Sequence, residues 1–153
     1  MTVRLALEPF DPQAETARFA AGRDDAGGLV SFVGLCRSAT DGAPVEELHI
    51  DYYPGFTEKE ITRLAQETAR RFDCLDLLVV HRAGRIRPGE AIVLVAALSV
   101  HRANAFEAVK VLMDYLKTDA PFWKKETGPG GARWIEPRAE DRLRRRQAEK
   151  DMA

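Results

Sequence analysis

Long apolar runs are absent from this sequence. The longest one, Ala91–Leu98, is far shorter than the roughly 20 residues that a membrane-spanning helix needs. The N-terminal segment carries Glu8 and Pro9 and has no long apolar stretch, so we expect no secretory signal. The protein is therefore expected to be soluble and to have no membrane partner.

Cysteine is also scarce. Cys36 and Cys74 are too few for a disulfide framework, so we expect reduced thiols and a cytoplasmic location. The chain has 153 residues, of which 45% are apolar and 31% charged. This composition is typical of one folded globular domain and excludes a disordered or fibrous protein.

An excess of charge of one sign is missing as well. Lys and Arg number 23 against 24 Asp and Glu, so nothing global indicates a nucleic-acid partner. The segment Arg138–Lys150 is nevertheless locally basic, with six basic and three acidic residues. Two interpretations stay open for this tail: a solvated, fraying terminal helix, or a contact with an acidic partner or a phosphate.

Several common catalytic signatures are missing. The sequence has no phosphate-binding glycine loop, no dinucleotide-binding turn and no Gly-x-Ser-x-Gly elbow. His49, His81 and His101 are widely separated and no Cys-x-x-Cys pair accompanies them, so we expect no metal site and no bound cofactor. Cys36 interrupts an apolar segment, which favours a small core residue over a nucleophile.

The hydrophobic periodicity predicts an α+β fold: a single domain with a mostly antiparallel sheet and helices packed on it. A capping box, Thr57-Glu-Lys-Glu60, marks the start of an amphipathic helix that runs to Phe72. The expected elements are a helix from Asp11 to Gly22, strands at Leu29–Arg37 and Val45–Tyr53, the helix after Thr57, paired strands at Leu75–Val80 and Ala91–Val100, a helix from Asn104 to Thr118 and a strand at Arg133–Glu136.

Polar residues follow three of the apolar elements. Arg37 ends the first predicted strand, and His101-Arg102 lies where the most apolar strand passes into a helix, a favoured place for anion binding. Lys117 ends that helix, and Pro121-Phe-Trp123 places apolar surface beside Lys124. A lysine among such groups has a depressed pKa and can act as a nucleophile or general acid–base, although a helix-terminal lysine can also simply complement the dipole.

An ordered set of motifs then resembles one known family, the large, catalytic subunits of molybdopterin synthase. The resemblance covers roughly Gly27 to Arg138. The matching segments are Phe32-Val-Gly-x-x-Arg37, Tyr52-Tyr-Pro-Gly-Phe-Thr-Glu58, His81-Arg-x-Gly84, Pro88-Gly-Glu90, Ser99-x-His-Arg102, Ala105-Phe-Glu107, Asp114-Tyr-Leu-Lys-Thr118, Ala120-Pro-Phe-Trp-Lys-Lys-Glu126 and Arg133-Trp-Ile-Glu136.

The resemblance implies a sulfurtransferase with an α/β-hammerhead-like fold. Such subunits convert a cyclic pyranopterin monophosphate, precursor Z, into molybdopterin by adding two dithiolene sulfurs. The sulfur comes from a small carrier subunit whose C-terminal Gly-Gly ends as a thiocarboxylate. Two large subunits form the central homodimer of a heterotetramer. Because this chain ends Asp151-Met-Ala153, we expect it not to be the carrier itself.

The resemblance also implies the site residues. Lys117 and Lys124 fall on catalytic positions, and Lys125 and Glu126 fall in the same pocket. Residues at substrate-binding positions, or next to them, are Leu35, Cys36, Arg37, His101 and Arg102. We expect residues 1–138 to form the catalytic domain and residues 139–153 a basic, helical or frayed tail.

Two non-catalytic alternatives remain open from the residues alone: a module that binds a pterin or a phosphate, and a scaffold for a β-grasp partner. A binding module would keep the anion-binding residues and would not need Lys117 and Lys124. The presence of both lysines favours the enzyme.

Overall fold

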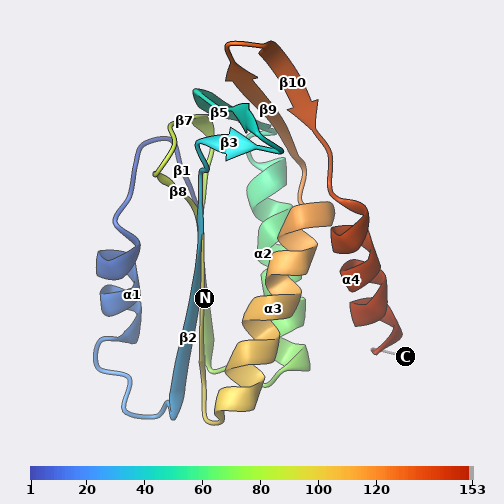
Figure 1. Cartoon of the computed structure of the whole chain (residues 1–153). Helices are drawn as coiled ribbons and strands as arrows, with labels where there is room; N and C mark the ends of the chain where they lie inside the picture. Colours follow the sequence, from blue (N-terminus) through green and yellow to red (C-terminus); the bar gives the residue numbers. More distant parts are fainter. Residues whose placement is uncertain (152–153) are drawn as a thin grey trace.

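The computed structural model describes residues 1–151, which form ten strands and four helices (Figure 1). The strands are β1 (Thr2–Ala6), β2 (Gly28–Leu35), β3 (Ala39–Thr40), β4 (Ala43–Pro44), β5 (Glu47–Tyr52), β6 (Asp76–Arg82), β7 (Gly84–Ile86), β8 (Ala91–Ser99), β9 (Phe122–Gly128) and β10 (Gly131–Ile135). The helices are α1 (Pro12–Ala20), α2 (Phe56–Arg71), α3 (Arg102–Thr118) and α4 (Ala139–Lys150).

The larger sheet has the strand order β1-β6-β8-β2. Helix α1 covers one face, and α2 and α3 cover the other (Figure 1). Strands β6 and β8 are buried on both faces, which explains why both read as continuous apolar runs rather than as alternating ones. The main core cluster lies between this sheet and the pair α2 and α3.

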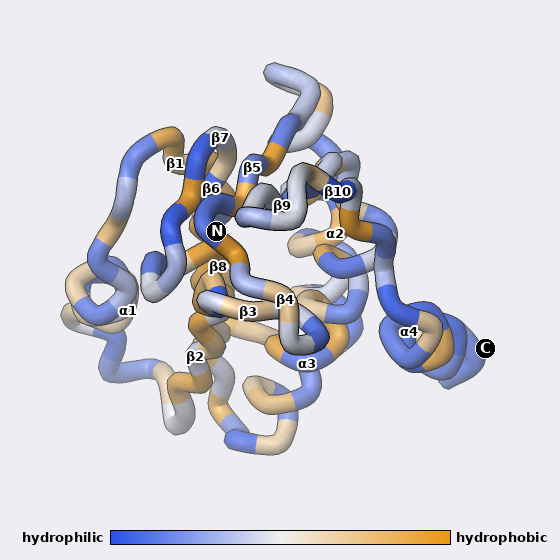
Figure 2. The backbone as a smooth tube through the Cα atoms, turned by 45° about the horizontal axis from the view of Figure 1, so that its top comes forward, coloured by the Kyte–Doolittle hydropathy of each residue, from blue (hydrophilic) through white to orange (hydrophobic). Residues whose placement is uncertain are grey.

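A second sheet, with the order β10-β9-β5-β7, lies across the end of the first, beside the small hairpin β3–β4 (Figure 1). Its inner face has its own apolar cluster, built on Cys36, Leu48, Ile50 and Ile86. The chain passes from β9 and β10 into α4, which packs against α3 and is mostly hydrophilic (Figure 2). The space between the second sheet, the C-terminus of α3 and the start of α4 holds the candidate site.

The predicted fold class is confirmed. The sheets are antiparallel except for one parallel pair, β1 with β6, and the paired strands after α2 are β6 and β8. The first helix is also confirmed, with Asp11 accepting hydrogen bonds from the N–H groups of Gln13 and Ala14. Strands β1, β7 and β9 were not predicted, because each is short or polar and is stabilised by pairing with a strand distant in the sequence.

The predicted capping box is wrong. Helix α2 begins at Phe56 after Gly55, and no side chain caps it. The Thr57 hydroxyl instead accepts a hydrogen bond from the Tyr53 N–H at 2.9 Å and donates one to the Pro121 carbonyl at 3.0 Å. Thr57 is fully buried, so a residue that looked like a local cap is a tertiary tie between the start of α2 and the start of β9.

The start of α3 differs from the expectation, because the helix begins at Arg102 rather than at Asn104. Gly128–Gly131 forms the turn of the β9–β10 hairpin. The basic tail forms α4 through Lys150, whereas the last two residues of the predicted segment 139–153 lie outside the described residues. Among the helices of the described chain, none has both the length and the apolar character needed to span a bilayer.

Candidate active site

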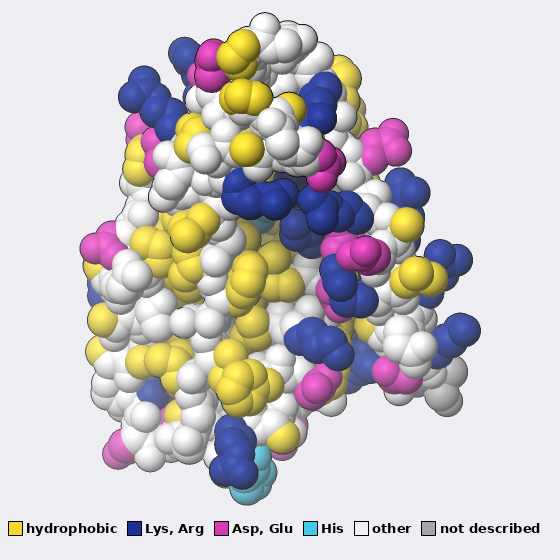
Figure 3. All heavy atoms as spheres, viewed as in Figure 1, with side chains coloured by type: hydrophobic (Ala, Val, Ile, Leu, Met, Phe, Trp, Pro, Cys, Tyr) yellow, Lys and Arg dark blue, Asp and Glu magenta, His cyan; other side chains and the backbone are white. Residues whose placement is uncertain are grey.

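A cavity of about 510 Å³ lies between β2, β9, β10, the C-terminus of α3 and the start of α4. Among its lining residues are Arg37, Lys117, Lys124, Arg138 and Asp141. Lys and Arg side chains gather around a hollow in this part of the surface (Figure 3). The cavity therefore brings together charged side chains from segments that are distant in the sequence.

Local structure explains how the two lysines reach the cavity. Lys117 lies in the last turn of α3, a helix whose buried face packs on the larger sheet, and its own side chain is exposed. Lys124 lies in β9, where side chains alternate between the two faces of the sheet. Its pairing partners Ile50 and Ile135 belong to the inner face, so Lys124 points inward with them.

The surroundings of Lys124 make its neutral amine form more populated than it is in a solvated lysine. Burial, together with the positive charge of Lys117, lowers its pKa to about 8, and the negative charge of Asp141 acts in the opposite direction. At neutral pH a fraction of roughly a tenth of Lys124 is therefore an amine able to accept a proton. This agrees with the depressed lysine pKa that the apolar neighbours predict from the sequence.

His81 is buried behind the part of the cavity lining that Phe122 and Lys124 form. Its ring stacks on Phe122, with 4.1 Å between the ring centroids and 19° between the planes, and the side chain is buried. Burial lowers the His81 pKa to about 3, with further lowering by the charge of Lys124. Its Nδ1 lies 2.7 Å from the Arg82 carbonyl, so the neutral ring donates its Nδ1–H there.

Glu126 ties the small hairpin β3–β4 to the second sheet. Its Oε1 accepts a hydrogen bond from the Thr40 hydroxyl at 2.8 Å, and its Oε2 accepts from Arg133 at 3.0 Å. Arg133 also donates to the Thr40 carbonyl. Thr40, Glu126 and Arg133 all line the cavity, so this network holds the hairpin in place as part of the cavity lining.

The end of β2 brings Leu35, Cys36 and Arg37 to the same cavity. The Cys36 N–H donates to the Glu90 carbonyl, and the Gly89 N–H donates to the Cys36 carbonyl. Cys36 is buried, and burial together with the charges of nearby carboxylates raises its thiol pKa. Cys36 therefore stays a thiol at neutral pH, which argues against a role as nucleophile.

Three of the expected site residues do not line this cavity. His101 and Arg102 are exposed at the opposite end of α3, about 22 Å from Lys117 at 1.5 Å per residue. Lys125 lies on the outer face of β9, because successive residues of a strand alternate, and its Nζ is 5.4 Å from the centroid of Trp134. Arg37, Lys117, Lys124 and Glu126 are the expected charged residues that the fold brings together.

Five charged residues of the cavity lining are absent from the predicted site: Asp41, Arg133, Glu136, Arg138 and Asp141. Arg138 precedes α4 and Asp141 lies in its first turn. An acidic residue in the first turn of a helix has an ordinary local explanation in the helix dipole, so nothing in the sequence marked Asp141 as part of a site. In the described part of the chain, no group of three or more His, Cys, Asp or Glu side chains is arranged to hold a metal ion.

Known proteins resemble this chain over most of its length. The family model described as MoaE protein matches residues 5–119. A molybdopterin synthase catalytic subunit from Caulobacter vibrioides is 51% identical over 142 residues, which is 93% of each chain.

Solved structures share the fold. A molybdopterin biosynthesis MoaE protein from Burkholderia ambifaria superimposes with a TM-score of 0.80 at 40% identity, over 96% of this chain and 97% of that one. A more distant match, from Helicobacter pylori, is described as the protein–protein complex of subunits 1 and 2 of molybdopterin-converting factor. It has a TM-score of 0.72 at 19% identity, covering 89% of this chain and 91% of that one.

Proposed function

The chain belongs to the MoaE family of molybdopterin synthase catalytic subunits, and we propose that it transfers sulfur from a small carrier subunit to a pyranopterin. The substrate is the cyclic pyranopterin monophosphate, precursor Z, and the product is molybdopterin, which carries two dithiolene sulfurs. The observation that carries this proposal is the convergence of Lys117 and Lys124, from different elements, on one cavity that also contains Arg37.

The cavity offers a binding site for an anionic substrate. Arg37 and Arg138 lie among its lining residues, and guanidinium groups match phosphate oxygens with two parallel hydrogen bonds. The hairpin held by Glu126 contributes Thr40 and Asp41 to the lining, so it encloses one side of the site. These features support binding of the phosphate and the pterin at this site.

The two lysines then have separate tasks in sulfur transfer. The thiocarboxylate sulfur of the carrier forms a bond to a side-chain carbon of the pterin as a C–O bond at that carbon breaks and its oxygen leaves protonated. Water then cleaves the acyl C–S bond, so the sulfur stays on the pterin and the carrier leaves as a carboxylate. Lys124, whose pKa is about 8, exchanges a proton with the reacting groups, and the positive charge of Lys117 stabilises the developing oxyanion. A hemisulfurated intermediate stays bound while a fresh carrier replaces the spent one and delivers the second sulfur.

A second copy of the chain would supply His101 and Arg102. Strand β2 is an edge of the larger sheet and exposes Leu29, Phe32 and Leu35. Hydrophobic side chains gather over β2 and α3 on this face of the molecule (Figure 3). Apolar side chains on an unpaired edge strand favour a two-fold contact between copies.

The direction of β2 allows such a contact to bring residues of one copy to the cavity of the other. Gly28, at the start of β2, lies against the Arg102 backbone, whereas Arg37 follows the end of the strand. A two-fold axis that pairs the two β2 strands antiparallel places the start of one strand beside the end of the other. The His101 and Arg102 of each copy would then approach the cavity of its partner, as expected for a central homodimer.

The carrier has a route to Lys124. A groove of about 830 Å³ runs between the β9–β10 hairpin and α4, and it shares Phe122, Lys124 and Trp134 with the cavity. Trp123 and Trp134 are exposed beside it, and exposed tryptophans are typical centres of protein interfaces. We therefore place the carrier tail in this groove.

We also place the reaction in the cytoplasm, because Cys36 and Cys74 are unpaired and thiols stay reduced there.

The decisive experiment mixes the purified chain with a thiocarboxylated carrier and precursor Z and measures the fluorescence of the oxidised product. The wild-type chain should form dithiolene, and Lys117→Ala should lower the rate by about a hundredfold or more. Lys110→Ala, an exposed lysine on the same helix outside the cavity, is the matched control and should keep the wild-type rate. Normal product formation by Lys117→Ala would refute the assigned role.

A further inference from the structure

The first turn of α4 is built into the wall of the cavity. Asp141 lines the cavity together with Lys117 and Lys124, and only 7% of it is exposed. Its Oδ2 accepts a hydrogen bond from the Arg138 N–H at 3.2 Å, and its Oδ1 accepts one from Arg144 at 2.7 Å. The carboxylate is therefore held by two donors in a partly enclosed position.

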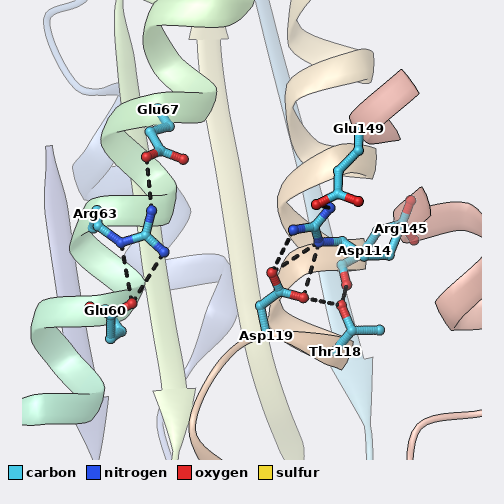
Figure 4. Close-up of polar contacts among 8 residues, drawn as sticks. All are labelled: Glu60, Arg63, Glu67, Asp114, Thr118, Asp119, Arg145 and Glu149. Atoms are coloured by element: carbon cyan, nitrogen blue, oxygen red, sulfur yellow. Dashed lines mark hydrogen bonds and ion pairs between the residues drawn. The ribbon is translucent and has the colours of Figure 1, made fainter. Parts of the chain in front are cut away.

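Several contacts anchor α4 on α3 and so fix the position of this carboxylate. Arg145 donates three hydrogen bonds of 2.7–3.0 Å to Asp119, at the end of α3 (Figure 4). Its guanidinium also lies over the Tyr115 ring, 4.5 Å from the centroid. Ala148 is buried in the main core cluster, so α4 is docked along its length rather than solvated on all sides.

Two other carboxylates near the cavity have partners of their own. Glu126 is bound by Arg133 and Thr40, and Asp114 lies 3.5 Å from Arg144. The neutral ring of His81 is electrostatically coupled to Lys124. The charged residues that line the cavity with Lys124 are Arg37, Asp41, Lys117, Glu126, Arg133, Glu136, Arg138 and Asp141.

Asp141 is electrostatically coupled to both lysines. Its charge raises the pKa of Lys124, against the lowering by burial and by Lys117. Burial raises the pKa of Asp141 itself, but the hydrogen bonds from Arg144 and the Arg138 N–H and the charge of Lys117 outweigh burial and lower it. Asp141 thus stays ionised at neutral pH and faces the lysine pair as a fixed anion.

We propose that Asp141 is a positioning residue of the sulfur-transfer reaction, and that α4 serves to bring its carboxylate to the lysine pair and to set how the pair holds its protons. This role rests on the proposed function of the cavity. A fixed anion opposes the binding of an anionic phosphate and a thiocarboxylate, so a contribution to substrate affinity does not explain its place there. Control of the protonation of the lysine pair explains why the carboxylate lies there.

The test removes the charge and keeps the shape. Asp141→Asn retains an oxygen that can accept from the Arg138 N–H, and the reactivity of Lys124 toward an amine reagent, acetic anhydride, is measured against pH by mass spectrometry. The midpoint for Lys124 should fall below about 8 by roughly half a unit or more. Glu140→Gln is the matched control, because Glu140 is the exposed neighbour in the same helical turn, and it should leave the midpoint in place.

Activity measurements give an independent readout. With precursor Z and thiocarboxylated carrier, Asp141→Asn should lower KM for the precursor and shift the rise of kcat to lower pH, so that kcat at pH 7 increases by about twofold or more. Asp141→Glu should restore the wild-type pH profile. A loss of packing alone would raise KM and leave the Lys124 midpoint unchanged. If Asp141→Asn does not fold, Asp141→Ser repeats the charge removal with a hydroxyl acceptor and is read in the same way.

An unchanged Lys124 midpoint in a folded, uncharged variant would overturn the proposal. The labelling experiment needs no substrate, so it separates this inference from the proposed function. A wild-type chain that never transfers sulfur would contradict the function, whatever the labelling shows.

Discussion

His81 lies directly behind Phe122, and their stacked rings form the inner side of the wall that carries Lys124. Phe122 and Lys124 are two residues apart in β9 and share its inner face. A buried imidazole at this position must remain neutral, because a second positive charge beside Lys124 and Lys117 would be costly. The protonation state of His81 therefore affects both the stability of the fold and the charge beside Lys124.

The neutral state of His81 predicts how stability depends on pH. Its pKa is about 3 in the folded protein and about 6.5 when unfolded, so the unfolded chain binds the extra proton between these values. The free energy of unfolding should therefore fall as pH decreases below about 6.5, with His81 contributing up to about 1.4 kcal/mol per pH unit. Urea denaturation at several pH values between 4.5 and 7 measures this slope.

His81→Phe should remove the His81 part of that slope, because the new ring keeps the stacking and does not titrate. His101→Phe replaces an exposed histidine just before α3 and serves as control, with the slope of the wild type. Identical slopes for His81→Phe and the wild type would show that His81 does not resist protonation.

The lowered pKa of Lys124 predicts the pH dependence of sulfur transfer. The amine form increases as pH rises through about 8, so the rate at saturating substrate should increase between pH 7 and 9 and then level off. Lys124→Arg keeps the positive charge and abolishes this titration, so it should lose about a hundredfold in rate and the inflection near pH 8. Lys110→Arg should retain both, and an inflection that persists in Lys124→Arg would assign the titration to another group.

The proposed sharing of the site between two copies predicts complementation between inactive variants. Lys117→Ala and Arg102→Ala should each be inactive alone. In a mixed dimer, however, one of the two sites has Lys117 from one copy and Arg102 from the other. After unfolding and refolding of an equal mixture, about a quarter of the wild-type activity should return. A mixture of Lys117→Ala and Lys124→Ala is the control, because both lysines line the same cavity of one chain, and it should stay inactive.

The contact between Thr40 and Glu126 predicts the mobility of the β3–β4 hairpin. Thr40→Val removes a hydrogen bond to a carboxylate, which contributes about 1.5 kcal/mol, so the open form should become about tenfold more populated. Limited proteolysis within residues 38–44 should then be faster by that factor. Thr16→Val removes a comparable hydroxyl in α1 and should not change the rate, whereas equal rates for Thr40→Val and the wild type would mean that Glu126 does not hold the hairpin.

The exposed aromatic residues beside the groove predict where the carrier docks. The Trp123 ring contacts the Tyr53 ring edge to face, with 4.9 Å between centroids, and 42% of Trp123 is exposed. Trp123→Ala should weaken binding of a carrier that ends in an ordinary carboxylate by about tenfold or more, measured by calorimetric titration. Leu75 is an exposed apolar residue just before β6, and Leu75→Ala should bind the carrier normally. A normal affinity for Trp123→Ala would place the interface elsewhere.

The sequence indicated the antiparallel core because its pattern is local and strong. The apolar runs around Val79 and Val95 could only be buried strands, and the Asp11 cap defined the first helix. Thr57 shows the limit of such reasoning. Its spacing to Glu60 suggests a local cap, but burial against the Pro121 carbonyl outweighs that preference.

The sequence by itself determined the class of fold, the family and the charged residues that could act on a pterin, because these depend on periodicity and on motifs of adjacent residues. Only the tertiary structure decided which of them meet. The alternation of β9 turns Lys124 inward and Lys125 outward, the length of α3 separates Arg102 from Lys117, and the docking of α4 brings Asp141 to the lysines. Each of these outcomes depends on pairing and packing between segments far apart in the chain, which no local pattern records.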